Sequence, residues 1–207
     1  MRPVKPVIGL IGAIGAGKST VAAVMGSLGG FVVDADKLGH EILDEPAVRD
    51  QLTARWGAGI LREDGTVNRR AVGAIVFADP AERKVLESIV FPRIHEREGA
   101  QFAVADADPA VSFIVLDAAV LVEAGRLDVC KKLVFVDAPR DDRLKRLAAR
   151  SGWTAEELTR REAAQLPLAE KRRLADATLD NDGDAGELRD AVATLLRRWR
   201  LVAPPAV

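Results

Sequence analysis

A glycine-rich stretch near the start of the chain has residue types and spacing that suit phosphate chemistry. "LIGAIGAGKST", residues 10–20, contains the pattern G-x-x-x-x-G-K-[ST], formed by Gly12, Gly17, Lys18 and Ser19. In such a loop, the backbone N–H groups from Gly15 to Ser19 can surround a phosphate at the positive end of a following helix. Lys18 would reach the β- and γ-phosphates, and the Ser19 hydroxyl would bind Mg²⁺. The pattern therefore predicts a nucleoside triphosphate site.

Three other interpretations of this stretch can be compared with the sequence that surrounds it. A secretory signal peptide would use Arg2 and Lys5 as its basic region, but the glycines are dense and "GKST" stands where a cleavage site is expected. A dinucleotide fingerprint needs G-x-G-x-x-G, which "GAIGAG" does not provide. A glycine turn without a ligand does not explain the Lys-Ser pair. An apolar run before the loop and a helical pattern after it favour the phosphate loop.

Carboxylates follow two further apolar runs. Asp34 and Asp36 follow "FVV", and Asp117 ends "FIVLD". The carboxyl ends of parallel strands line the ligand crevice of an α/β sheet, so Asp36 could accept a proton from an attacking hydroxyl or help to hold Mg²⁺ through water. Asp117 has the position of a Mg²⁺-binding aspartate at a strand end. The alternatives are that Asp36 caps a helix beginning near Lys37 and that Asp117 is an ordinary turn residue.

Basic residues gather between about 143 and 173. Arginines that close over a transferring phosphoryl group stabilise its charge, and Arg146 and Arg150 lie one turn apart on one helical face. Most of the other basic residues fit a solvated helical surface. A nucleic-acid-binding surface is disfavoured by the formal net charge of −1 and by the few aromatic residues nearby.

The elements that would position these residues alternate along the chain. Apolar runs at 7–11, 31–35, 112–117 and 132–138 lack a period of two, which is typical of parallel strands covered on both faces. Helical patterns follow them, and one is predicted to begin with Asp79 as cap, Pro80 in the first turn and Glu82 completing a capping box. The alternation of strands and helices along the chain predicts a doubly wound parallel sheet in a three-layer α/β/α fold of the P-loop kinase type.

The composition and the alternation of apolar runs with helical patterns predict one domain with two helical additions. The chain has 207 residues, 48% of them hydrophobic and 29% charged. We expect a core at 1–45, 106–149 and 176–203, a helical insertion on the substrate side at 46–105, a helical lid at 150–175, and a frayed tail at 203–207. A last short strand falls in "ATLDNDG", before a C-terminal helix at 186–198.

Composition also bears on location and metal binding. The single cysteine, Cys130, indicates a reducing cytoplasm and is expected to be a buried, inert thiol. Two histidines and one cysteine disfavour a zinc site. No apolar run is long enough to cross a membrane. Nothing in the sequence fixes an oligomeric state.

Segments along nearly the whole chain resemble the dephospho-coenzyme A kinase family. In family order they are "GLIGAIGAGKSTVA", "VVDADKLGHEIL", "EDGTVNRRAVGAIVFADPAERKVLESIVFPRI", "DAAVLVE", "LVFVDAPRDDRLKRLAAR" and "AAQLPLAEKRRLADATLDNDG". A P-loop alone is shared by many families, so the later segments carry the specificity of the resemblance.

The resemblance implies a Mg²⁺- and ATP-dependent kinase that phosphorylates the 3′-hydroxyl of the adenosine ribose of dephospho-coenzyme A. It places the base on Asp36, with Asp34 in support, and the lid arginine on Arg146. The catalytic set it implies is Lys18, Asp36 and Arg146. The ATP-binding set is Gly12, Ala13, Gly15, Ala16, Gly17, Lys18, Ser19, Thr20, Arg146, Arg150 and Asn181, the last near the adenine. The acceptor-binding set is Asp34, Asp36, His40, Phe91, Asp117 and Glu123, and the metal ligands are Ser19 and Asp117.

The chain departs from the family pattern mainly on the acceptor side. Phe91 stands where the family often has histidine, Ala119 begins a run that is usually Pro-Leu-Leu, and His40 replaces a frequent arginine. In the loop, Ala13 replaces a common glycine. Phe91 has no hydrogen-bonding group. Two alternatives therefore stay open: a kinase for another nucleotide or small alcohol, and a nucleotide-gated binding protein, which would not need a carboxylate such as Asp36.

Overall fold

The computed structural model describes residues 3–203 and divides into two compact units. The first comprises residues up to Asp34 together with those from Gln101 onward, and the second comprises Ala35–Ala100. The five-stranded sheet belongs to the first unit. The predicted partition into core, insertion and lid stays a prediction. Of the predicted frayed tail at 203–207, residues 204–207 lie outside the described part of the chain.

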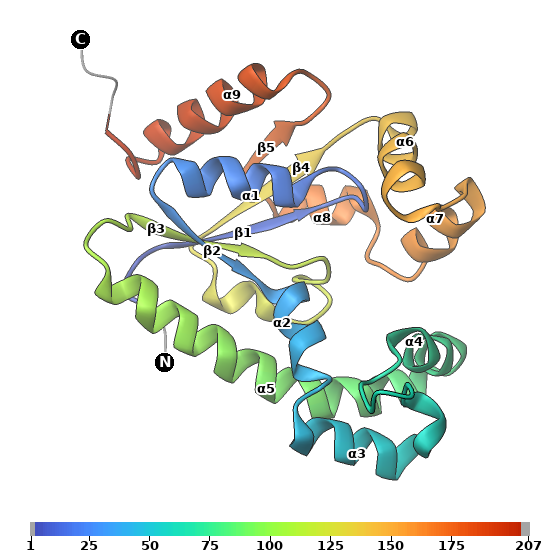
Figure 1. Ribbon diagram of the computed structural model, residues 1–207. Coiled ribbons are helices and arrows are strands. Elements are labelled where there is room, and N and C mark those ends of the chain that lie inside the picture. Colours follow the sequence, from blue (N-terminus) through green and yellow to red (C-terminus); the bar gives the residue numbers. More distant parts are fainter. Residues whose placement is uncertain (1–2, 204–207) are drawn as a thin grey trace. The chain divides into compact units, whose positions relative to one another are not determined.

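A parallel sheet forms the frame of the first unit. Its strands are β1 (Val7–Gly12), β2 (Gly30–Asp34), β3 (Phe113–Asp117), β4 (Lys132–Asp137) and β5 (Ala177–Asp180). They lie in the order β2-β3-β1-β4-β5 (Figure 1). This arrangement confirms the predicted doubly wound α/β fold. Strand β1 is buried along its whole length between two partners, as expected for a parallel strand covered on both faces.

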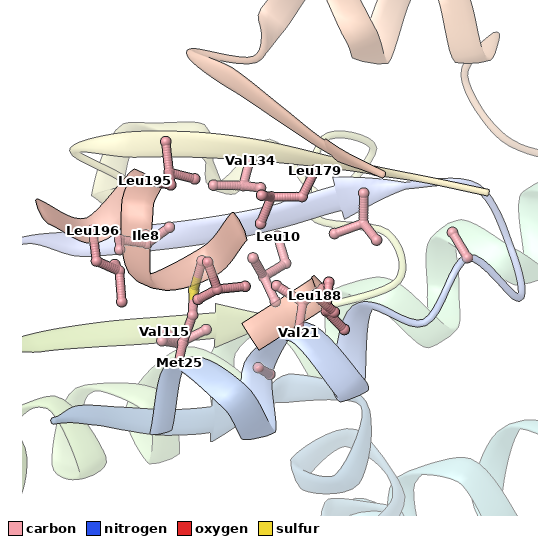
Figure 2. Packing of buried hydrophobic residues seen from close by; sticks show 14 of the residues in the cluster. Ile8, Leu10, Val21, Met25, Val115, Val134, Leu179, Leu188, Leu195 and Leu196 are labelled. Carbon is pink, nitrogen blue, oxygen red and sulfur yellow. The ribbon is translucent and has the colours of Figure 1, made fainter. Parts of the chain in front are cut away.

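Two helices cover one face of this sheet and enclose its main core. Helix α1 (Lys18–Ser27) contacts β1, β2 and β3, and α9 (Ala185–Arg198) contacts α1 and β5 (Figure 1). Ile8 and Leu10 of β1 point into this layer, where Figure 2 shows them among Val21, Met25, Val134, Leu188 and Leu195. The burial of these side chains fixes the end of β1, and with it the start of the glycine-rich loop.

The remaining elements of the first unit include α6 (Arg140–Ser151), α7 (Ala155–Glu162), α8 (Leu168–Leu174) and the 3-10 turn η2 (Arg126–Val129). Helix α8 contacts β1 and β4. Gly9 lets this part pack tightly, because a Cβ there would lie 2.6 Å from Leu121 Cδ2 and 2.7 Å from Cys130 Sγ. Cys130 is half-buried rather than buried as predicted, because it is the C-cap of η2, whose residues are themselves half-buried or exposed.

The second unit is helical, as expected for this stretch. It contains α2 (Ala35–Ile42), α3 (Pro46–Trp56), the 3-10 turn η1 (Ala58–Ile60), α4 (Arg69–Ala78) and α5 (Pro80–Ala107) as far as residue 100. Glu45, between α2 and α3, accepts hydrogen bonds from Arg93 and Arg97, one turn apart on α5. This carboxylate ties the start of α3 to α5, and the two guanidinium groups lower its pKa.

The alternative role of Asp36 as a helix cap and the predicted capping box of Glu82 are both wrong. Helix α2 begins at Ala35, directly after β2, so Asp36 lies in the first turn instead of capping a helix that begins near Lys37. At the start of α5, Asp79 accepts from the Ala81 N–H as expected. Glu82 does not complete a capping box: it accepts hydrogen bonds from Arg55 and Trp56 of α3, because a charged partner and an indole N–H lie within reach. Across residues 3–203, no helix combines the length and apolar character needed to span a membrane.

Candidate active site

The glycine-rich loop joins β1 to α1, and its glycines are required by the backbone. Gly12, Gly15 and Gly17 have φ values of 144°, 78° and 90°, which side-chain-bearing residues rarely adopt. A Cβ at Gly12 would lie 2.2 Å from the Val136 carbonyl oxygen, and one at Gly17 would lie 2.1 Å from Asn181 Nδ2. In the sequence, Gly15 begins the run of backbone N–H groups expected to surround a phosphate, and a side chain on Gly15 or Gly17 would obstruct that approach. The structure adds that neighbouring protein atoms leave them no room for a side chain.

The inner side of the loop presents backbone donors. The N–H of Ala16 donates to the Ala13 carbonyl at 3.2 Å. Within the described part of the chain, no protein acceptor is found for the N–H groups of Gly15, Gly17 and Ser19. Ala13 and Ala16 are buried in the core cluster, which holds the loop to the sheet. Several backbone N–H groups that converge at a helix N-terminus form an anion site.

The side chains at the start of α1 suit a triphosphate. Lys18 Nζ lies 3.3 Å from the Ala13 carbonyl oxygen, so the ammonium group is held over the loop. Ser19 and Thr20 are exposed in the first turn. The helix N-terminus, the ammonium group and a hydroxyl therefore gather where the sequence predicted phosphate binding.

The outer side of the loop is held by two arginines and an asparagine. Arg143 Nη1 donates to the Ile14 carbonyl at 3.1 Å. The Ala16 carbonyl accepts from Arg146 Nη1 at 3.3 Å and from Asn181 Nδ2 at 2.7 Å. Because these groups bind the loop's carbonyl oxygens, they fix the orientation of its peptide planes.

Arg146 and Asn181 thus have a role that the sequence did not predict. Arg146 Nη2 also donates to the Asn181 carbonyl at 2.7 Å, and Asn181 is 8% exposed. Both residues support the phosphate loop directly, while their contacts with ATP stay predictions. Arg150 is exposed at the end of α6, and its side chain makes no hydrogen bond or ion pair with any described residue.

Asp34 and Asp117 end neighbouring strands and are paired in register. Strand β3 also pairs with β1, where Asp117 is opposite Leu10. Neighbouring strands are about 4.8 Å apart, so the two carboxylates stand side by side, with Asp117 on the strand next to β1 and Asp34 one strand further away. Asp117 is 6% exposed. A cation would relieve the repulsion of two such charges.

This donor set fits a magnesium ion that is also held by phosphate. Among the described residues there is no group of three or more histidine, cysteine or carboxylate side chains that could hold a metal alone. Mg²⁺ in kinases is bound through one or two protein oxygens, with phosphate oxygens and water completing the octahedron. The exposed Ser19 hydroxyl and the Asp117 carboxylate supply oxygen ligands of this kind.

Glu123 anchors the segment between α7 and α8. Its Oε1 accepts from Lys171 Nζ at 2.8 Å and from the Leu166 N–H at 3.0 Å. Lys171 is 1% exposed, and its ammonium group also donates to Gln165. Burial raises the pKa of Glu123, but the hydrogen bonds from Lys171 and Leu166 outweigh it and leave that pKa lowered. The predicted acceptor contact of Glu123 stays a prediction. Its partners lie too far along the chain for a local motif to indicate them.

The predicted acceptor residues of the second unit lie on α2 and α5. Asp36 and His40 are exposed one turn apart on α2. Gly39 of α2 faces Ile94 of α5, and a Cβ there would lie 3.4 Å from Ile94 Cδ1, an ordinary van der Waals distance. On α5, the Phe91 ring stacks on the His95 ring at a centroid distance of 6.1 Å. The sequence interpretation missed His95, although its spacing of four residues from Phe91 in a helical pattern was visible.

Comparison with known proteins decides the family. The chain matches the dephospho-CoA kinase family over residues 6–187. The chain belongs to the dephospho-CoA kinase family. A dephospho-CoA kinase from Carboxydothermus hydrogenoformans is 36% identical over 199 residues, which cover 95% of this chain and 96% of the relative.

Solved structures agree with this family assignment. The Thermus thermophilus protein TT1252 has a TM-score of 0.78 at 32% identity, covering 94% of this chain and 97% of that one. The dephospho-CoA kinase from Campylobacter jejuni has a TM-score of 0.68 at 25% identity, covering 95% and 98%. The first unit of this dephospho-CoA kinase family member contains the predicted phosphate loop together with Arg146, Asn181, Asp34 and Asp117. The second unit carries Asp36, His40 and Phe91.

Proposed function

We propose that the chain transfers the γ-phosphoryl group of ATP to the 3′-hydroxyl of the adenosine ribose of dephospho-CoA, giving CoA and ADP. The observation that carries this proposal is the phosphate loop beside the paired carboxylates Asp34 and Asp117, in a chain of the dephospho-CoA kinase family. In the reaction the ribose oxygen forms a bond to the γ-phosphorus. The bond from that phosphorus to the β–γ bridging oxygen breaks, and the hydroxyl proton passes to a carboxylate.

The loop and α1 would hold the triphosphate. The N–H groups of Gly15, Gly17 and Ser19 bind phosphate oxygens, and Lys18 balances the charge on the β- and γ-phosphates. Bound Mg²⁺ supplies further charge neutralisation on these oxygens. Ser19 and Asp117 are the residues that would hold it. This support is electrostatic and is in place before the reaction, which is how such enzymes lower the barrier.

Asp36 would be the base, with Asp34 in support. A carboxylate that accepts a hydrogen bond from the ribose hydroxyl orients the oxygen for attack and takes its proton as the new bond forms. The exposed position of Asp36, two residues after the end of β2, supports this role. Arg146 and Arg150 would stabilise charge on the phosphates, and Asn181 would lie near the adenine. His40, Phe91 and Glu123 are proposed acceptor contacts.

One assay compares this proposal with its two alternatives. ADP release is measured with ATP and Mg²⁺ against dephospho-CoA, AMP, UMP, shikimate and adenosine, and the product is located by mass spectrometry. We expect strong stimulation by dephospho-CoA alone, with one phosphate added to its ribose. Stimulation by another acceptor instead would indicate a different kinase, and slow hydrolysis without stimulation would indicate a nucleotide-gated binding protein. We also propose a cytoplasmic location, consistent with a chain whose one cysteine cannot form an intrachain disulfide.

A further inference from the structure

Arg143 is a buried arginine whose hydrogen bonds reach three separate segments. It is 5% exposed on α6, although arginine is seldom buried without several partners. Its Nε donates to the Ala138 carbonyl at 3.2 Å, just after β4. Its Nη1 donates both to the Ile14 carbonyl of the phosphate loop and to the Glu162 carboxylate at the end of α7. One guanidinium therefore joins the phosphate loop to the predicted lid.

The surroundings of Arg143 make this link stiff. A Cβ at Gly15 would lie 2.9 Å from Leu147 Cδ1 and 3.1 Å from the Arg143 carbonyl oxygen, so α6 packs directly against the loop. Arg140, one turn before Arg143, donates to Thr159 Oγ1 at 2.8 Å and fixes α7 at a second point. The Glu162 side chain is 25% exposed, so the ion pair lies at the border of the packed region.

The hydrogen bonds of Arg143 to Ile14 and to Glu162 have different effects on the structure. The bond to Ile14 holds a loop carbonyl outward, which keeps the neighbouring N–H groups available to phosphate. Because Glu162 belongs to α7, its ion pair with Arg143 links a movement of the loop to a movement of α7. A planar guanidinium can serve both because it has five donors in fixed directions, which a lysine lacks.

We infer that Arg143 is a positioning residue that couples the phosphate loop to α7 through Glu162. Nucleotide bound at the loop is then sensed in α7 without touching Arg143. For catalysis this inference rests on the proposed function, because the lid is expected to close over the transferring phosphoryl group. Loss of Glu162 breaks the coupling but leaves the loop supported, whereas loss of Arg143 removes both.

Glu162→Gln tests this inference, with Glu157→Gln as the matched control. Glu157 is another carboxylate of α7, but its ion-pair partners Arg160 and Arg161 lie in the same helix. Hydrogen–deuterium exchange is measured for the loop and for α7, with and without a non-hydrolysable ATP analogue. In wild type and in Glu157→Gln, the analogue should protect both segments. In Glu162→Gln, protection of α7 should fall by about tenfold or more while that of the loop is kept.

Kinetics with dephospho-CoA supply the second measurement. Glu162→Gln should lower kcat by about tenfold with little change in KM for ATP, whereas Arg143→Gln should also raise that KM. If Arg143→Gln does not fold, the comparison of Glu162→Gln with Glu157→Gln still tests the inference. The inference is overturned if Glu162→Gln matches Glu157→Gln in exchange and in kcat, or if it loses loop and α7 protection equally. A wild-type protein that is inactive on dephospho-CoA would refute the proposed function alone, because the exchange measurement needs no acceptor.

Discussion

Replacing Glu123 with glutamine should destabilise the first unit strongly, because it removes the charge that compensates a buried ammonium group. Lys171 is 1% exposed, and its Nζ lies 2.8 Å from Glu123 Oε1. Removing one partner of a buried ion pair costs about 3–5 kcal/mol. Glutamine keeps an acceptor for Lys171 and for the Leu166 N–H, so we expect a loss of about 3 kcal/mol, at the lower end of that range.

The loss should be visible in urea and in thermal unfolding followed by circular dichroism. For a chain of this size, about 3 kcal/mol corresponds to a fall in Tm of about 6–12 °C. The pKa of Glu123 is lowered below its ordinary value of 4.5, so its carboxylate stabilises the folded state above that pH, and the effect is lost as the pH falls. The difference between wild type and Glu123→Gln should therefore be full at pH 7 and narrow below pH 4.5.

A double replacement separates the charge from the packing. Glu123→Gln combined with Lys171→Met leaves no buried ammonium group and keeps an unbranched side chain of similar length, so it should be more stable than Glu123→Gln alone. The reasoning is refuted if Glu123→Gln lies within about 1 kcal/mol of wild type, since surface ion pairs contribute no more than that. It is equally refuted if the double variant is the less stable of the two.

Three further predictions concern catalysis and pH. Asp36→Asn should lose most turnover yet keep ATP binding, and Lys18→Ala should weaken both binding and transfer; near-normal turnover of Asp36→Asn would remove Asp36 as the base. Asn181→Ala should raise KM for ATP and reduce stability by about 1–3 kcal/mol, because the Ala16 carbonyl loses the shorter of its two side-chain hydrogen bonds. Calorimetric titration with an ATP analogue and urea unfolding test this. Glu45→Gln should lower the unfolding midpoint in urea at pH 7, because Arg97 and Arg93 lower the pKa of Glu45 below 4.5 and its carboxylate then stabilises the folded state. This stabilisation is lost as the pH falls through the lowered pKa, so in acid the midpoints of the variant and the wild type should become indistinguishable.

Local sequence patterns were sufficient to predict the frame of the fold. Apolar runs without alternation indicated parallel strands, and β1, β2, β3 and β4 lie where those runs lie. The loop spacing indicated the turn from β1 into α1 because glycine is the residue that readily adopts positive φ. Asp34 and Asp117 were expected at strand ends, and the sheet order then placed them in register. That register needed the structure, since strand order is not written in local periodicity.

The contacts that support the loop could not be read from the chain, because each joins residues far apart in sequence. Arg146 and Asn181 were interpreted as nucleotide ligands from family resemblance, and in the structure both bind the Ala16 carbonyl. The two roles are compatible in physical terms. A guanidinium behind the loop holds a peptide plane whose N–H side faces the phosphate, and its positive charge adds to the potential at the same site. An arginine here would therefore favour phosphate binding before it touched any phosphate. Its replacement by lysine, which keeps the charge but not the paired donors, should weaken ATP binding less than replacement by alanine does.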